Sequence, residues 1–153
     1  MTIRSCVALA AVAAALFGVA APARADNVTL LAALIKWSAV IEKDAGALGA
    51  AANKGPDPAD AAALKLKSDA LAATSAIDAI KPSSTIGSQI RDQVAIALRN
   101  YQLAGQELHL AVVAAKHNDI KHAQAHSNKA VSAAQTGGSQ LTQTVKLFRK
   151  LKA

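Results

Sequence analysis

Apolar residues, many of them alanine, recur at steps of four and three along most of this chain, and most regularly between Ile86 and Ala115. This spacing matches the turn of an α-helix, and there it is sustained for about four heptads, as in a coiled coil. Hydrophobic residues make up 52% of the 153 residues but aromatic residues only 3%, because alanine, the best helix former, dominates the apolar positions. Strand formers are scarce. The sequence therefore predicts an all-α fold and argues against a β-sandwich or barrel.

Breaker and capping residues at 53–58, 81–84 and 116–119 divide the chain after residue 25 into four helical segments. The segments cover about residues 28–52, 58–81, 84–117 and 119–151. The expected N-caps are Asp26 or Asn27, Asp57, Ser84 and Asp119. Short connections force neighbouring helices to run antiparallel. Residues 26–153 are therefore predicted to form one alanine-rich, up-down-up-down antiparallel four-helix bundle.

The N-terminus has the pattern of a secretory signal peptide, residues 1–25. Arg4 supplies the positive charge, Val7 to Ala21 is an unbroken apolar run, and Ala23-Arg24-Ala25 fits the small-residue cleavage site. We expect cleavage after Ala25 and export to the periplasm or the exterior. The single cysteine, Cys6, would be removed, which excludes thiol catalysis, zinc ribbons and iron–sulfur clusters for the mature chain.

Two features of the predicted helices have more than one interpretation. The pair Gly137-Gly138 interrupts the fourth helix and indicates a kink or a close approach of a neighbouring helix, with a functional hinge or ligand contact as the alternative. The third helix is longer than the second. If both start from the turn at Pro82, the hairpin tip at 108–127 projects beyond the first hairpin, unless residues 46–60 unravel and fold over it.

All four histidines fall in that predicted tip, and three of them could share a metal ion. His122 and His126 are spaced i, i+4 on one helical face, and His109 lies at about the same level on the antiparallel helix. Zinc, copper or nickel would suit such ligands, with Asp119 and Glu107 as further ligands or supporting partners. Solvated histidines and a pH-responsive surface are the other interpretations, because nearby lysines oppose cation binding.

Basic residues are concentrated late in the chain, within a formal net charge of +7. The C-terminal end carries four of them: Lys146, Arg149, Lys150 and Lys152. They either complement the helix dipole or bind an anionic surface such as lipid headgroups or an acidic wall polymer. Nucleic acid is a poor candidate because no aromatic residues are interleaved with the basic ones.

No catalytic constellation is apparent, and no cofactor is expected. The chain lacks a nucleophile elbow, a phosphate-binding glycine loop and a paired acid and base. Haem is disfavoured because the mature chain has no methionine ligand and no Cys-x-x-Cys-His motif. The leading hypothesis is a non-enzymatic bundle that binds an envelope component or a protein partner after export. The alternative is a metal-binding or metal-buffering protein that uses His109, His122 and His126, with zinc or copper as the metal.

Overall fold

The computed structural model describes the backbone of residues 25–151 and the side chains of residues 27–148. Its regular elements over that range are four α-helices, without strands. They are α2 (Ala25–Ala52), α3 (Pro56–Asp78), α4 (Thr85–Lys116) and α5 (Ile120–Leu151). The predicted all-α, four-helix fold is therefore confirmed. The predicted signal peptide, apart from Ala25, lies outside the described residues.

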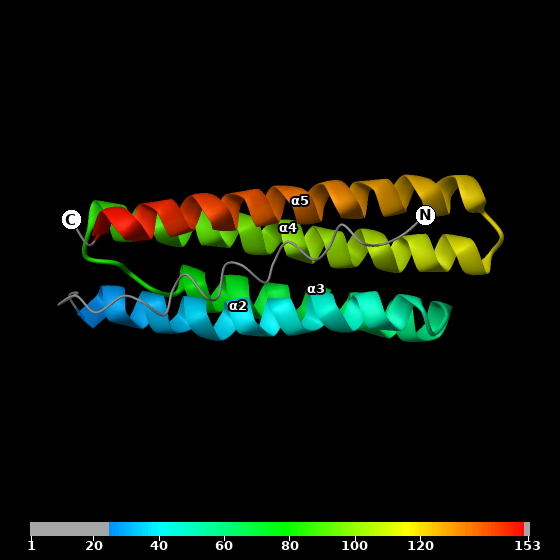
Figure 1. Ribbon diagram of the computed structural model, residues 1–153, viewed down its shortest axis with the longest axis horizontal. Helices are drawn as coiled ribbons and strands as arrows, with labels where there is room; N and C mark the ends of the chain where they lie inside the picture. The colour runs from blue at the N-terminus through cyan, green and yellow to red at the C-terminus, as the bar shows by residue number, and fades with distance from the viewer. Residues whose placement is uncertain (1–24, 152–153) are drawn as a thin grey trace.

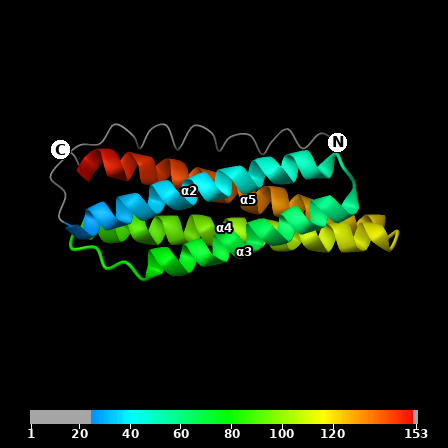
Figure 2. The ribbon, with the colours of Figure 1, turned by 90° about the horizontal axis from the view of Figure 1, so that it is seen from below.

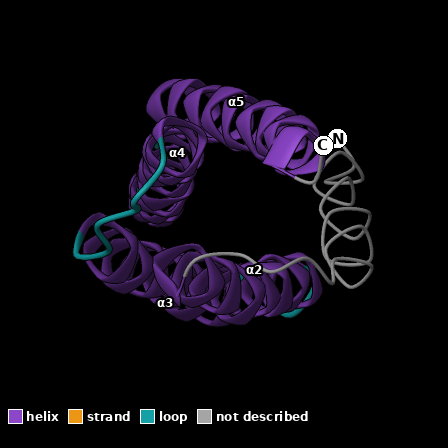
Figure 3. Ribbon diagram, turned by 90° about the vertical axis from the view of Figure 1, so that its left-hand side faces the viewer, coloured by secondary structure: helices purple, strands orange, loops and turns teal. Residues whose placement is uncertain are grey.

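Successive helices are joined at alternate ends of a long, narrow molecule (Figures 1 and 2). α4 packs along α5 on one side and along α3 on the other, and α2 packs mainly on α3. No Cα atom of α2 lies within 8 Å of one in α5. Viewed from the end, the ribbons of α2 and α5 stand apart (Figure 3).

Two of the expected N-caps are confirmed. Ser84 Oγ accepts a hydrogen bond from the Gly87 backbone N–H at 3.0 Å, and Asp119 Oδ1 accepts one from the His122 N–H at 3.1 Å. Each bond satisfies a backbone donor that the first turn of a helix leaves without a partner.

The caps expected for the first two helices are wrong. α2 already begins at Ala25, so Asp26 and Asn27 lie inside it. α3 begins at Pro56 rather than after Asp57, with Gly55 as the capping residue at φ 116°. Proline is preorganised for a first helical position, and glycine tolerates the positive φ that precedes it here.

The small residues let the helices approach closely. α5 runs unbroken through the glycine pair. A Cβ atom added at Gly137 would lie 3.0 Å from the carbonyl oxygen of Ala97 and 3.1 Å from the ring of Tyr101, both on α4. One added at Gly105 would lie 2.7 Å from the carbonyl oxygen of Ala63 on α3. The close-approach interpretation of Gly137 is therefore confirmed.

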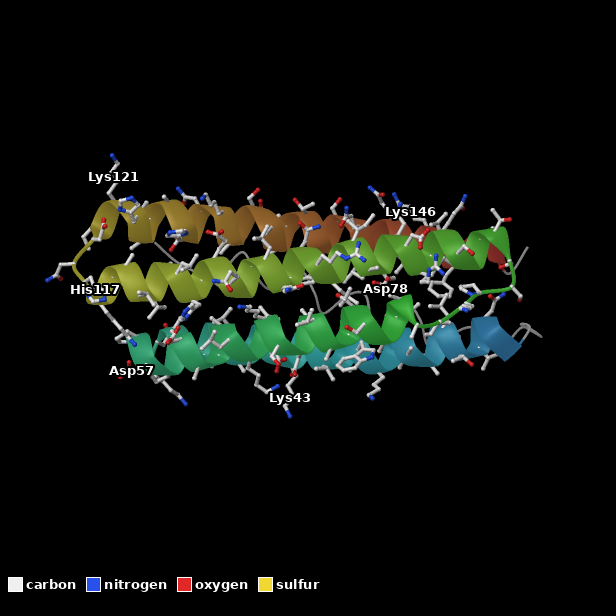
Figure 4. All side chains as sticks on the ribbon, turned by 180° about the vertical axis from the view of Figure 1, so that it is seen from behind. Lys43, Asp57, Asp78, His117, Lys121 and Lys146 are labelled. Carbon is white, nitrogen blue, oxygen red and sulfur yellow. The ribbon has the colours of Figure 1, made fainter. Side chains whose placement is uncertain are left out.

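The α4–α5 hairpin does not project beyond α3 in the way that the helix lengths suggest. α3 ends at Asp78. Residues 79–84 then run lengthwise beside the first turns of α4 before the chain enters that helix (Figure 1). Arg99 Nη2 therefore pairs with Asp78 at 2.9 Å, and Lys116 Nζ reaches Asp57 at 2.6 Å. Figure 4 shows Asp57 beside His117 at one end of the molecule. The tip reaches past the α2–α3 end by less than the helix lengths predict (Figures 1 and 2), because the connection is an extended segment and not a tight turn at Pro82.

Candidate functional site

The end of the molecule formed by the α4–α5 turn carries three imidazole–carboxylate pairs. Each of the predicted metal ligands places its Nδ1 beside a different carboxylate: His109 beside Asp60 (2.5 Å), His126 beside Glu107 (2.6 Å) and His122 beside Asp119 (2.6 Å). The first pair joins α4 to α3, the second joins α5 to α4, and the third lies within the first turn of α5. The pairs therefore tie three helices together at this end.

The structure does not gather the three imidazoles into one ligand set. Among the described residues, no group of three or more His, Cys, Asp or Glu side chains is arranged to hold a metal ion. His126 and Glu107 form the most enclosed pair, with side chains 23% and 13% exposed, whereas the side chain of His122 is 66% exposed. The three-histidine metal site stays a prediction.

Sequence reasoning named Glu107 and Asp119 as partners but missed Asp60. Asp60 is 49 positions from His109 in the sequence, and whether the two side chains meet depends on the longitudinal position of α3 relative to α4. Only the placement of the 79–84 connection decides that distance, and no local pattern encodes it.

The predicted anionic-surface residues are described only in part. Lys146 is exposed on α5, and the side chains of Arg149, Lys150 and Lys152 lie outside the described ones. The binding of an anionic surface by this end therefore stays a prediction.

A small apolar pocket lies between α2, α4 and α5, and we call it the α2–α5 groove. Residues of three helices line it: Leu34, Trp37, Ser38, Ile41, Val94, Leu98, Leu141, Thr144, Val145 and Phe148. Sequence reasoning assigned most of these apolar residues to helical seams and left Trp37 as either a core residue or an aromatic anchor. Trp37 is half-buried at the groove, between those two roles.

The groove offers apolar contacts almost exclusively. Its two hydroxyl groups donate to backbone carbonyls of their own helices, Ser38 to Ile35 at 3.1 Å and Thr144 to Gln140 at 3.0 Å. Its cavity volume is about 30 Å³. That is close to the volume of one water molecule in the liquid and far below the roughly 150 Å³ that encloses benzene. A ligand of that size therefore does not fit inside the groove unless the lining side chains move.

A cation stands over one side chain of this groove. Lys36 Nζ stands 4.9 Å from the ring centroid of Trp37, which is cation–π distance, and the exposed Lys146 follows Val145 directly. The lining contains no carboxylate. The groove lining is thus apolar and carries no charge.

A buried acidic residue of α2 lies where this helix packs on α3. Asp44 is 2% exposed, and its Oδ1 lies 2.9 Å from Lys65 Nζ, which also pairs with Asp69. Burial raises the pKa of Asp44, whereas the hydrogen bond from Lys65 lowers the pKa of Asp69. Because Lys65 already occupies the space between the carboxylates, this cluster is a pairing of α2 with α3 rather than an open site.

Comparison with protein-family models, with curated proteins and with solved structures finds no match to this chain. None of the helices in the described part of the chain is long and apolar enough to span a membrane.

Proposed function

We propose that this protein is exported, folds as an up-down-up-down antiparallel bundle, and acts by binding a component of the cell envelope without catalysing a reaction. The observation that carries the proposal is the α2–α5 groove, an apolar lining between two helices whose backbones stay apart. Trp37 and Val145 are the apolar side chains of this lining that stay partly exposed, and exposed apolar surface commonly marks a binding site. The signal-peptide pattern of residues 1–25 supports an envelope location.

Export is tested by expressing the full chain in a bacterium and measuring the intact mass of the product in each cell fraction by mass spectrometry. We expect a periplasmic or secreted product that begins at Asp26. A product confined to the cytoplasm with residues 1–25 retained would contradict this part of the proposal.

Binding is tested by sedimentation of the purified protein with envelope fractions. Val145→Glu puts a carboxylate into the groove lining. Val131→Glu is the matched control, because Val131 lies two heptads earlier on α5, is 42% exposed and is not among the lining residues. We expect Val145→Glu to reduce sedimentation at least tenfold and Val131→Glu to change it little. Equal losses in both variants, or no sedimentation of the unchanged protein, would contradict binding through the groove.

A specific observation favours metal binding as a second candidate function. Metal-binding histidines usually donate one ring N–H to a carboxylate, which fixes the tautomer and presents the other nitrogen to the metal. His109, His122 and His126 each have Nδ1 beside a carboxylate, so in each ring Nε2 is the nitrogen left for a ligand. A metal ion bound through Nε2 of two of these three histidines, with water molecules as its other ligands, would not need the third histidine.

Calorimetric titration with zinc and copper tests the second candidate. We expect binding that His126→Ala removes and that Glu107→Gln weakens by about 10–100-fold, since loss of a supporting carboxylate typically has that effect. His117→Ala is the control, because His117 lies in the same turn and has no carboxylate among the pairs described above. Absence of binding heat, or an equal loss in the control, would contradict the metal function.

A further inference from the structure

We infer that a hollow between α3 and α4 binds an acidic sugar unit, whose carboxylate is held by a lysine and an arginine. Five side chains line this α3–α4 hollow: Lys67, Arg99, Gln102, Leu103 and Gln106. None of them lines the α2–α5 groove, so the inference goes beyond the proposed function and does not depend on it. Its support comes from the charge of the hollow, its hydrogen-bonding groups and its size.

The packing of α3 on α4 brings the two cationic side chains to one place. The four lining residues of α4 are spaced i, i+3, i+4 and i+7 from Arg99, so they share one face of that helix. Gly105 lets α3 approach closely, because a Cβ atom there would lie only 3.0 Å from Lys67 Cβ. The base of the Lys67 side chain therefore lies against α4, and both cationic side chains border the same hollow.

The charge of Lys67 has no counter-ion in the protein. Every acidic side chain of α3 and α4 pairs with another basic side chain: Asp57 with Lys116, Asp60 with His109, Asp69 with Lys65, Asp78 with Arg99, Asp92 with Arg91, and Glu107 with His126. Within these two fully described helices, Lys67 is the one lysine or arginine without an ion pair. The lining contains no carboxylate. A hollow lined by charge of one sign concentrates ions of the opposite sign, so this one attracts an anion.

Arg99 is oriented by an acidic partner and still has donors to offer. Its Nη2 donates to Asp78 Oδ2 at 2.9 Å, and Asp78 is not part of the lining. A guanidinium group also carries N–H donors on Nε and Nη1. Hydrogen bonds from lysine or arginine to a carboxylate are among the stronger ones that proteins make. We therefore assign the carboxylate of the ligand to Lys67 and to these remaining donors of Arg99.

The other lining residues match a sugar ring. Gln102 and Gln106 are half-buried, and neither makes a hydrogen bond to another described side chain or to the backbone. A carboxamide both donates and accepts hydrogen bonds, as a sugar hydroxyl group does. Leu103 is 47% exposed and offers an apolar contact to the C–H face of a ring. Two amides and one leucine beside two cations thus complement a ring with several hydroxyl groups and one carboxylate.

The size of the hollow argues for an organic ligand. Its volume is about 490 Å³. Small-molecule sites commonly measure about 300–1,000 Å³, whereas an inorganic anion would fill only a small part of this space. An acidic amphipathic peptide would find a single apolar anchor here, and nucleic acid would find no aromatic side chain on which a base could stack.

Nuclear magnetic resonance tests the inference, because it reports weak binding residue by residue. The purified, ¹⁵N-labelled protein is titrated at low salt with trigalacturonate, and separately with maltotriose as a neutral trisaccharide. We expect trigalacturonate to shift the side-chain amide signals of Gln102 and Gln106, with an affinity at least about tenfold above that of maltotriose. Added salt should weaken the binding of trigalacturonate and leave that of maltotriose unchanged.

Two lysine variants with the same change of charge locate the site. We expect Lys67→Gln to weaken trigalacturonate binding about tenfold, since it removes a charge-assisted hydrogen bond. Lys43→Gln is the matched control, because Lys43 is exposed on α2 and does not line the hollow. It should stay within about twofold of the unchanged protein, because exposed charges far from the site are screened. Lys67→Arg keeps the charge and should retain binding within about threefold, which separates loss of the cation from loss of the fold.

The contradicting outcomes are distinct. Equal weakening by Lys67→Gln and Lys43→Gln would mean attraction to the net positive charge of the protein, and would overturn binding in the hollow. Equal affinity for inorganic phosphate and trigalacturonate would overturn the assignment of a sugar. Absence of shifts at Gln102 and Gln106 would overturn the site itself. Val145→Glu in the α2–α5 groove should leave trigalacturonate binding unchanged, so the two sites succeed or fail separately.

Discussion

Two glycines in neighbouring helices should respond oppositely to the same substitution. Gly105 and Gly138 are both helical, and alanine is favoured over glycine by about 1 kcal/mol in a helix interior. A Cβ atom at Gly138 would meet nothing closer than Tyr101 Oη at 3.6 Å, an ordinary van der Waals distance. Gly138→Ala should therefore raise the free energy of unfolding by about 1 kcal/mol.

Gly105→Ala has the same propensity gain but meets the backbone of α3. The added Cβ would lie 2.7 Å from the carbonyl oxygen of Ala63 and 2.8 Å from the backbone nitrogen of Lys67. Backbone atoms cannot rotate away, so α3 and α4 must separate, and such overpacking costs about 1–3 kcal/mol. After the propensity gain, we expect a net loss of up to about 2 kcal/mol.

Thermal unfolding followed by circular dichroism measures both effects. At about 3 °C per kcal/mol for a chain of this size, Gly138→Ala should raise the Tm by about 3 °C and Gly105→Ala should lower it by up to about 6 °C. Gly46→Ala on α2 is a second control, because a Cβ there meets nothing within 4 Å. Equal stabilisation by Gly105→Ala and Gly138→Ala would refute the claim that α3 and α4 are in contact at Gly105.

Three other predictions concern charged residues. Burial raises the pKa of Asp44, so its ionised form is disfavoured in the folded state. Asp44→Leu should therefore raise the free energy of unfolding in urea by about 1 kcal/mol at neutral pH. The gain should shrink at acid pH, where Asp44 of the unchanged protein becomes protonated. Hydrogen bonds to the Asp119 carboxylate lower its pKa, so its contribution is complete above the ordinary value of 3.8 and is lost as the pH falls below it. Asp119→Ala should therefore lower the Tm at neutral pH, by an amount that shrinks below pH 3.8; a constant difference would contradict this cap. Arg99→Gln breaks only an exposed ion pair with Asp78 and should change the free energy of unfolding by less than about 1 kcal/mol. A larger loss would contradict the view that packing, and not this ion pair, sets the longitudinal register of α3 on α4.

The helices were predictable from the sequence because their information is local. The seam from Ile86 to Ala115 and the capping residues Ser84 and Asp119 each depend on residues within a few turns of one another. The start of α3 was misplaced because Gly55 and Pro56 together can begin a helix without a side-chain cap, which makes Asp57 unnecessary.

The longitudinal register of α3 was not predictable, and with it the partner of His109. Both depend on whether residues 79–84 form a tight turn or an extended segment, and proline at position 82 is compatible with either. The sequence therefore predicts the spacing of His122 and His126 on one helix, but it does not predict that Asp60 lies beside His109.

The groove was not predictable for a related reason. Periodicity assigns Leu34, Ile41, Leu141 and Phe148 to inward faces, and the structure agrees that they face the interior. The same periodicity would be seen whether α2 and α5 touched or stayed apart. That separation depends on the angle between α2 and the α4–α5 pair, which arises from packing over the whole length of the bundle.

Hydrogen–deuterium exchange in the presence and absence of envelope fractions tests the central claim most directly, because it shows which surface is covered. The account predicts slower exchange in the parts of α2 and α5 that border the groove, residues 34–41 and 141–148, and unchanged exchange at the α4–α5 turn, residues 108–127. Protection confined to the α4–α5 turn, or protection nowhere in the described helices, would contradict it.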